Sequence, residues 1–142
     1  MDIVALLQRR GMKVKEIRGW GTYLRKRWEE AFASHLSDDE KTSIYLFDRG
    51  GACGFLWHVF SYEKRECLTE IQAEKAFNLE KKDSCYLFYQ HSNFSLYLEK
   101  ATALKAEDLS EEMDVYVVDK EFTWTFVYTH EKGWCGPYFS RK

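Results

Sequence analysis

The feature that most constrains the fold is a pair of segments near the C-terminus, residues 115–118 and 122–129, both rich in β-branched and aromatic residues. Three polar residues, Asp119, Lys120 and Glu121, separate them. This composition favours strands, and the short polar break favours a tight connection between them. The sequence therefore predicts an antiparallel hairpin. Because side chains alternate along a strand, its aromatic face would carry Phe122, Trp124, Phe126, Tyr128 and His130, with Thr and Val on the other face.

The first third of the chain has helical patterning. Residues 2–10 fit a short helix that ends at Gly11, and residues 12–17 alternate like a strand. After a turn at residues 19–21, with Thr22 as the expected N-cap, apolar side chains recur at three- and four-residue spacing. This spacing predicts an amphipathic helix. Its apolar stripe would consist of Leu24, Trp28, Ala31, Phe32, His35 and Leu36.

The middle of the chain mixes signals for helices and strands. A capping box at residues 37–40 predicts a helix that continues past Phe47 to Gly50 and Gly51. Residues 55–62 and 85–89 are expected to be strands, residues 69–77 a helix, and residues 94–104 fit either. We expect an α+β fold in one domain over residues 1–142, with N-terminal helices packed on a mostly antiparallel sheet that ends in the C-terminal hairpin.

No segment has the features of a signal peptide or a membrane span. Asp2 stands where a signal peptide has a basic residue, and the longest apolar run, residues 52–60, is too short to cross a bilayer. The four cysteines form no closely spaced pair. We therefore expect a cytoplasmic protein with reduced thiols and without a membrane partner.

Charge is distributed unevenly along the chain. Residues 1–30 hold eight basic and four acidic side chains, a net charge of +4. Because the whole chain has a net charge of −2, the remaining residues carry a net charge of −6. The basic stretch includes Trp20, Tyr23 and Trp28, a combination that could contact phosphates and bases. Trp28, however, belongs to the apolar stripe, and the whole chain is slightly acidic, which argues against a nucleic-acid partner.

The segment Trp134-Cys135-Gly136-Pro137 matches the start of a thioredoxin-type active site, but the match is incomplete. That chemistry needs a second thiol three residues after the first, where this chain has Tyr138, and a helix that begins at the first thiol. We therefore expect a turn that docks the C-terminal tail through Trp134, Tyr138 and Phe139.

Metal binding and catalysis are the alternatives that the sequence leaves open. Cys53 and His58 are five residues apart, as are His130 and Cys135, and His91 or Glu131 could add a ligand. Residues five apart on a strand point to opposite faces, so this spacing does not favour zinc. A small enzyme or metal protein built on His58, His130 and Cys135 remains the alternative function. The leading expectation includes no catalytic residue, metal ligand or cofactor.

Binding of another protein fits the remaining features best. Seven acidic residues lie between positions 107 and 121, next to the aromatic hairpin. Acidic surfaces attract basic partners, and exposed tryptophans supply affinity. We expect a non-catalytic binding module for a basic protein, similar in kind to immunity proteins that neutralise toxins. The expected binding residues are Trp134, His130, Glu131, Glu111, Glu112 and Asp114.

Several segments resemble one protein family. They are Phe55-Leu56-Trp57-His58, Phe60-Ser61-Tyr62, residues 114–131, and the closing run from Trp134 to Phe139. Together they are similar to a family of uncharacterised small proteins of this length from spore-forming Firmicutes, defined as a domain of unknown function. The resemblance implies a bacterial cytoplasmic protein with one compact domain, and it implies no activity or site residues.

Overall fold

The computed structural model of the chain describes residues 2–48 and 54–142. Its α-helices are α1 (Ile3–Arg9), α2 (Gly21–Phe32), α3 (Asp38–Ser43), α4 (His58–Ser61) and α5 (Glu70–Leu79). Its strands are β1 (Lys13–Glu16), β2 (Leu68–Thr69), β3 (Cys85–Tyr89), β4 (Ser95–Glu99), β5 (Val115–Asp119), β6 (Trp124–Tyr128) and β7 (Tyr138–Arg141). Two short 3-10 helices, η1 (Ala101–Ala103) and η2 (Ala106–Leu109), connect β4 to β5.

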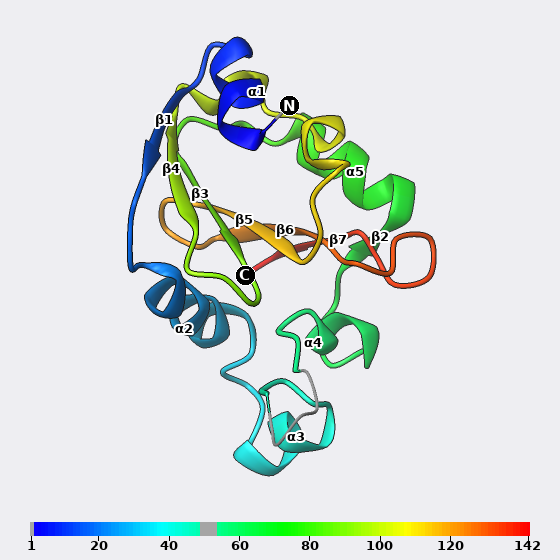
Figure 1. Cartoon of the computed structure of the whole chain (residues 1–142). Coiled ribbons are helices and arrows are strands. Elements are labelled where there is room, and N and C mark those ends of the chain that lie inside the picture. The colour runs from blue at the N-terminus through cyan, green and yellow to red at the C-terminus, as the bar shows by residue number, and fades with distance from the viewer. Residues whose placement is uncertain (1, 49–53) are drawn as a thin grey trace.

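The strands form one sheet in the order β1-β4-β3-β5-β6-β7-β2, and every neighbouring pair is antiparallel (Figure 1). The predicted C-terminal hairpin is confirmed as β5 and β6, with Val115 opposite Tyr128 and Val118 opposite Thr125. The expected α+β class with a mostly antiparallel sheet is therefore correct.

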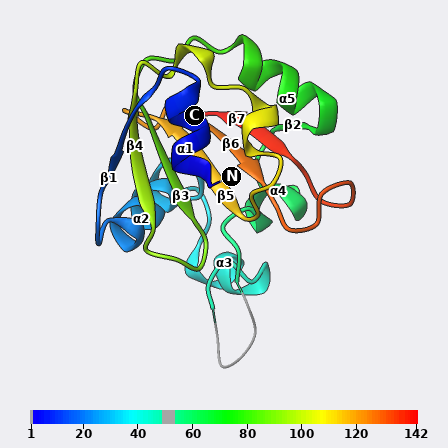
Figure 2. The ribbon, with the colours of Figure 1, turned by 45° about the horizontal axis from the view of Figure 1, so that its top comes forward.

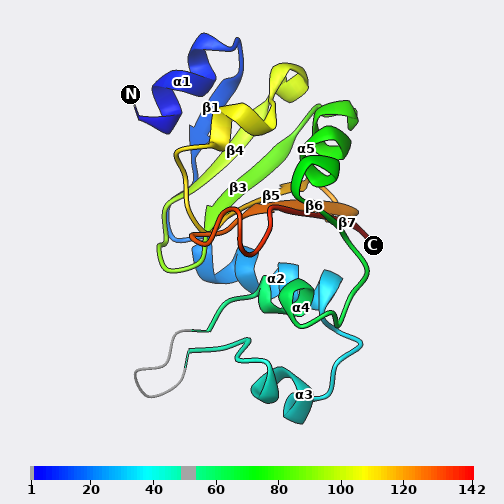
Figure 3. The ribbon, with the colours of Figure 1, turned by 90° about the vertical axis from the view of Figure 1, so that its right-hand side faces the viewer.

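Helices cover both faces of the sheet, so the molecule has two hydrophobic cores. On one face, Leu7 of α1 and Phe77 of α5 pack against the sheet. Helices α2 and α4 lie on the other face (Figure 3). Their residues Trp28 and Phe60 belong to the second core. Helix α3 is the element farthest from the sheet in every view (Figure 2). This arrangement explains why the chain can bury so many aromatic rings, since each face of the sheet has its own core.

The predicted N-terminal helices are largely confirmed. Helix α1 begins where the Asp2 side chain accepts a hydrogen bond from the Ala5 amide, at 3.0 Å, and ends before Gly11, whose φ is +89°. Helix α2 buries Leu24, Trp28, Ala31 and Phe32 of the expected stripe, whereas His35 and Leu36 lie beyond its end and His35 is exposed. Thr22 is not its N-cap, because the helix already starts at Gly21. A Cβ atom there would lie 2.8 Å from the Cα of Asn93, so only glycine permits this close approach.

Two predicted elements differ from the structure. The Ser37–Glu40 capping box is present, but α3 ends at Ser43 instead of continuing, because Tyr45 adopts a left-handed backbone with φ of 56°. The expected end of that helix at Gly50 and Gly51 lies outside the described residues.

Residues 55–62, predicted as a strand, instead form a turn and the short helix α4. The consecutive residues 56–57 and 59–60 are buried, which a strand with one exposed face would not allow. Packing in the second core therefore overrides the strand preference of these aromatic residues. The undecided segment 94–104 divides into β4 and η1.

Both faces of the hairpin are buried. Trp124, Phe126 and Tyr128 enter the first core, as their alternation predicted. The face of small residues is also covered, because the indole Nε1 of Trp28 donates to Thr125 Oγ1 at 2.8 Å. Phe122 was assigned wrongly to the aromatic face, since it lies before β6 at a φ of 57° and enters the second core.

Within the described residues, no helix combines the length and the apolar character needed to cross a membrane.

Candidate functional site

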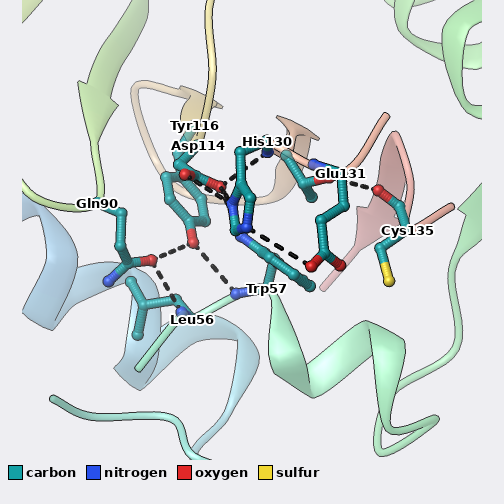
Figure 4. Close-up of polar contacts among 9 residues, drawn as sticks. Leu56, Trp57, Gln90, Asp114, Tyr116, His130, Glu131 and Cys135 are labelled. Atoms are coloured by element: carbon teal, nitrogen blue, oxygen red, sulfur yellow. Dashed lines mark hydrogen bonds and ion pairs between the residues drawn. The ribbon is translucent and has the colours of Figure 1, made fainter. Parts of the chain in front are cut away.

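The candidate site lies at the open end of the β5–β6 hairpin. Asp114 precedes β5 and His130 follows β6 by two residues, and the pairing of Val115 with Tyr128 brings the two side chains together. Trp57, just before α4, approaches from the second core. Figure 4 shows His130 between Asp114 and Glu131, with Trp57 beside it.

Asp114 organises this site through its carboxylate. Its Oδ1 accepts from the indole Nε1 of Trp57 at 3.0 Å and from the backbone amide of His130 at 3.1 Å. Nδ1 of His130 lies 3.1 Å and 3.0 Å from the two carboxylate oxygens. The Asp114 side chain is only 16% exposed, and its backbone adopts a left-handed conformation with φ of 51°. Asp tolerates that conformation better than most residues, so the sequence position suits the role.

The second imidazole nitrogen of His130 lies near a second carboxylate, that of Glu131. Nε2 lies 3.6 Å from Oε1 of Glu131, and both side chains are partly exposed. The imidazole also packs against the rings of Phe55 and Trp57, with centroids 5.0 Å and 5.9 Å away. A carboxylate on one nitrogen and two neighbouring aromatic rings hold His130 in one orientation.

Three of the four histidines gather around Phe55, which the sequence did not indicate. The ring centroids of His58, His91 and His130 lie 5.4, 5.1 and 5.0 Å from that of Phe55. Each Nδ1 also faces an oxygen: the carbonyl of Tyr45 for His58, at 2.9 Å, and the carboxylate of Asp48 for His91, at 3.5 Å. The spacing of these histidines along the chain carries no signal, because Phe55 joins them only in the folded protein.

A metal centre does not result from this gathering. Among residues 2–48 and 54–142, no group of three or more His, Cys, Asp or Glu side chains is arranged to hold a metal ion. Cys53, one of the ligands considered from the sequence, lies outside these residues.

A buried hydrogen-bond network fixes the segment before α4 to the sheet. The Tyr116 hydroxyl of β5 donates to Oε1 of Gln90 and accepts from the Trp57 amide at 3.1 Å. The same Gln90 oxygen accepts from the Leu56 amide at 2.9 Å. Burial raises the pKa of Tyr116 well above its usual value, so its hydroxyl stays protonated as a donor. Tyr116 and Gln90 therefore position Trp57, although no sequence pattern singles out either residue.

Residues 129–136, here called the Trp134 loop, connect β6 to β7. The Glu131 carbonyl accepts from the amides of Trp134 and Cys135, at 2.9 Å and 2.7 Å. The Thr129 hydroxyl donates to the Cys135 carbonyl, and the Lys132 ammonium donates to the Ser110 carbonyl. Trp134 itself is 86% exposed. The expected docking of the C-terminal tail is confirmed, since β7 pairs with β6 in the sheet. Trp134 does not contribute to it, because its side chain is exposed.

The acidic residues expected to form one surface have different roles. Glu111 is exposed, whereas Glu112 accepts a hydrogen bond from the Tyr89 hydroxyl and Asp114 turns inward. Trp134, His130 and Glu131, three of the expected binding residues, all belong to the Trp134 loop because they are neighbours in the sequence. The third member of the alternative site, Cys135, shares this loop.

The Cys135 thiol lacks the features of a nucleophile. Burial and a hydrogen bond to the Glu131 carboxylate raise its pKa, which favours the thiol over the reactive thiolate. Cys67, Cys85 and Cys135 are all free. The incomplete thioredoxin match is therefore not a redox site of the kind in which a lowered thiol pKa drives the reaction.

The raised pKa values of two other cysteines make the free energy of unfolding depend on pH. Burial raises the pKa of Cys67 to about 11 and that of Cys85 to about 12, from 9.0. Above pH 9 the unfolded chain loses these thiol protons while the folded chain keeps them. The contribution of the two thiols to the free energy of unfolding is therefore fully present below pH 9 and decreases as the pH rises above it. We expect the stability difference between the wild type and Cys85→Ala to shrink by about 1.4 kcal/mol per pH unit between pH 9.0 and about 12.

Urea unfolding of both proteins over this range measures the effect. Leu87→Ala removes a neighbouring buried side chain that does not titrate, so its difference from the wild type should stay constant. A Cys85→Ala difference that is also independent of pH would contradict the prediction.

Comparison with known proteins identifies the family. The model of the family described as Domain of unknown function (DUF4275) matches residues 1–139. No curated protein and no solved structure is similar enough to match. The resemblance to a domain of unknown function, inferred from the sequence, is thereby confirmed. The match covers nearly the whole sequence, and the chain therefore belongs to the DUF4275 family.

Proposed function

We propose that this protein is a non-catalytic binding module of the bacterial cytoplasm that captures another protein, of basic character, through the Trp134 loop. The observation that carries the proposal is the exposure of Trp134, 86%, on a loop that is otherwise tied down by hydrogen bonds. Exposing an indole to water is unfavourable for an isolated protein, and tryptophan is among the residues most enriched at binding hot spots.

The rigidity of the loop supports this role. The contacts of Glu131 and Thr129 define the backbone conformation, and Asp114 holds His130 at the start of the loop. A partner would therefore meet a surface that needs little further ordering. Less entropy is lost when such a surface binds, so more of the contact energy appears as affinity.

Charge supports a basic partner. Glu131 lies within the loop and Glu111 is exposed nearby, while Lys132 of the loop donates to the Ser110 carbonyl next to Glu111. Acidic side chains at the rim of an interface accelerate the approach of a basic protein. Immunity proteins, which neutralise toxins by binding them, illustrate this mode of action by analogy of surface character alone.

Substitution of Trp134 tests the proposal. The tagged protein, recovered gently from its own host, is analysed by native mass spectrometry, and any copurifying partner is then titrated against variants. We expect Trp134→Ala to weaken the partner's affinity by about 30-fold or more, since hot-spot residues contribute about 2 kcal/mol or more.

The matched control is Leu79→Ala on α5, because Leu79 is also 86% exposed. It should leave the affinity unchanged. A partner that binds Trp134→Ala and the wild type equally would show that binding occurs elsewhere, and a protein that is recovered without any partner would contradict a stable complex.

A second candidate function is a small enzyme in which His130 acts as a general base. The observation that favours it is the Asp114 carboxylate on Nδ1 of His130, which leaves Nε2, 3.6 Å from Oε1 of Glu131, as the nitrogen that would accept a proton. Combined alanine substitution of His58, His130 and Cys135 tests it. If the metal content and every activity detected in the wild type persist in this variant, the second candidate is excluded.

A further inference from the structure

A row of aromatic rings lies on the sheet face at the β1 edge, away from the Trp134 loop. Trp20 packs edge-on against Tyr23, with centroids 5.1 Å apart, and stacks over Tyr86 of β3 at 6.2 Å. Tyr86 in turn contacts Tyr97 of β4 at 5.2 Å. We call these four residues the aromatic strip. Trp20 and Tyr23 are 41% and 49% exposed, and the two strand tyrosines are half-buried.

The strip exists because α2 covers only part of its face of the sheet. Trp28 of α2 packs against Tyr116 of β5 and bonds to Thr125 of β6. Strands β4 and β1 lie beyond this contact, toward the free edge (Figure 1). Cross-strand pairing places Tyr86 opposite Tyr97 and Tyr97 opposite Lys15, so a lysine continues the row of rings across the sheet.

Basic side chains surround the strip. Lys15 lies at one end, Arg18 precedes the Trp20 turn, and the Arg27 guanidinium lies 4.3 Å from the centroid of Phe122, whose ring contacts Tyr86. Tyr23, Lys26, Arg27 and Glu30 line a hollow of 390 Å³. In the described part of the chain, no ion pair is formed by Lys15, Arg18, Lys26 or Arg27.

We propose that the aromatic strip and its four basic neighbours bind single-stranded nucleic acid. Partly exposed rings provide faces on which unpaired bases stack, and cations within reach neutralise the phosphates between them. Both features are required, because rings alone fit any apolar partner and cations alone fit any acidic one. A double helix keeps its bases stacked inside, so the rings would have nothing to bind there.

This inference departs from the expectation based on composition, for a structural reason. The total charge of −2 averages over the chain, but the fold concentrates basic residues from β1 and α2 on one surface. Trp28 is indeed in the core, as expected. Its place in the aromatic surface is taken by Tyr86 and Tyr97, which lie 56 and 67 residues beyond the end of the basic stretch at Glu30.

Fluorescence anisotropy with labelled oligothymidylate and oligouridylate of about 15 nucleotides tests the proposal, starting at about 50 mM salt. We expect both to bind, and the logarithm of the affinity to fall with the logarithm of the salt concentration with a slope of about −2 to −3, as expected for three or four phosphate contacts. Trp20→Ala should weaken binding about 10-fold, and Lys15→Glu with Arg18→Glu should flatten the salt slope by about one or more.

Three controls keep the result specific. Trp134→Ala should bind as the wild type does, which separates this surface from the proposed protein-binding loop. The double variant Lys64→Glu with Lys81→Glu alters the net charge by the same amount as Lys15→Glu with Arg18→Glu, but at exposed positions elsewhere. It should change the affinity for the oligonucleotides and the salt slope less. Circular dichroism confirms that each variant is folded.

Absence of binding at low salt would overturn the proposal, as would a folded Trp20→Ala variant with wild-type affinity. Equal competition by polyglutamate would instead assign the surface to acidic polypeptides. Preference for a duplex of the same length would likewise overturn the stacking role of the rings.

Discussion

Trp28→Ala is expected to lower the free energy of unfolding by about 3–5 kcal/mol, the usual cost of truncating a large buried aromatic residue. Trp28 is 0% exposed, and its ring contacts those of Phe32, Phe60 and Tyr116 at 5.1, 5.8 and 5.4 Å. Its indole also bonds to Thr125, so it connects α2, α4 and two strands. The expected loss is a large fraction of the stability of a typical domain. Urea unfolding followed by circular dichroism measures it.

Two further variants separate the causes of this loss. Trp28→Phe keeps most of the ring packing but removes the donor to Thr125, and should cost less than the alanine variant. Trp134→Ala removes the same side chain at an exposed position and should change stability by no more than about 0.5 kcal/mol. Equal losses for Trp28→Ala and Trp134→Ala would contradict the assignment of Trp28 to the core.

Asp114→Ala is expected to lower the free energy of unfolding by about 3 kcal/mol. The substitution removes the acceptor for the Trp57 indole, the His130 amide and the His130 imidazole together. Donors left without a partner in a partly buried site account for most of this cost. Alanine is also less favourable than Asp at a φ of 51°.

Asp114→Asn is the matched variant, since it keeps an acceptor oxygen and tolerates the left-handed backbone. We expect it to cost about 1 kcal/mol, because the charge of the acceptor is lost. Glu111→Ala, an exposed acidic residue nearby, should be close to neutral. If all three variants were equally stable, the Asp114 network would not contribute to folding.

Local patterns predicted several elements from the sequence. The capping box at Ser37, the Asp2–Gly11 helix boundaries and strand β3 required only neighbouring residues, and they are confirmed. The hairpin followed from alternation and its polar turn. The strand predicted for residues 55–62 was wrong, because aromatic side chains fit a strand and a buried turn equally well. There the contacts of Trp57 with Tyr116 and Asp114, far along the chain, decide the conformation.

Only some residues of the candidate site could be selected from the sequence. His130, Glu131 and Trp134 are neighbours in sequence, so their proximity required no fold. The inward orientation of Asp114 follows from the β5–β6 pairing, and the roles of Phe55, Gln90 and Tyr116 depend on three segments that meet only after folding. The same holds for Tyr86 and Tyr97 beside Trp20.

The sequence by itself thus determined the α+β class, the C-terminal hairpin and the apolar stripe of α2, because periodicity and capping act over a few residues. The tertiary structure decided which face of the sheet each helix covers and which part of a face stays open. It also decided which histidine meets which carboxylate. These outcomes depend on packing and hydrogen bonds between residues distant in the chain, for which one sequence carries no local signal.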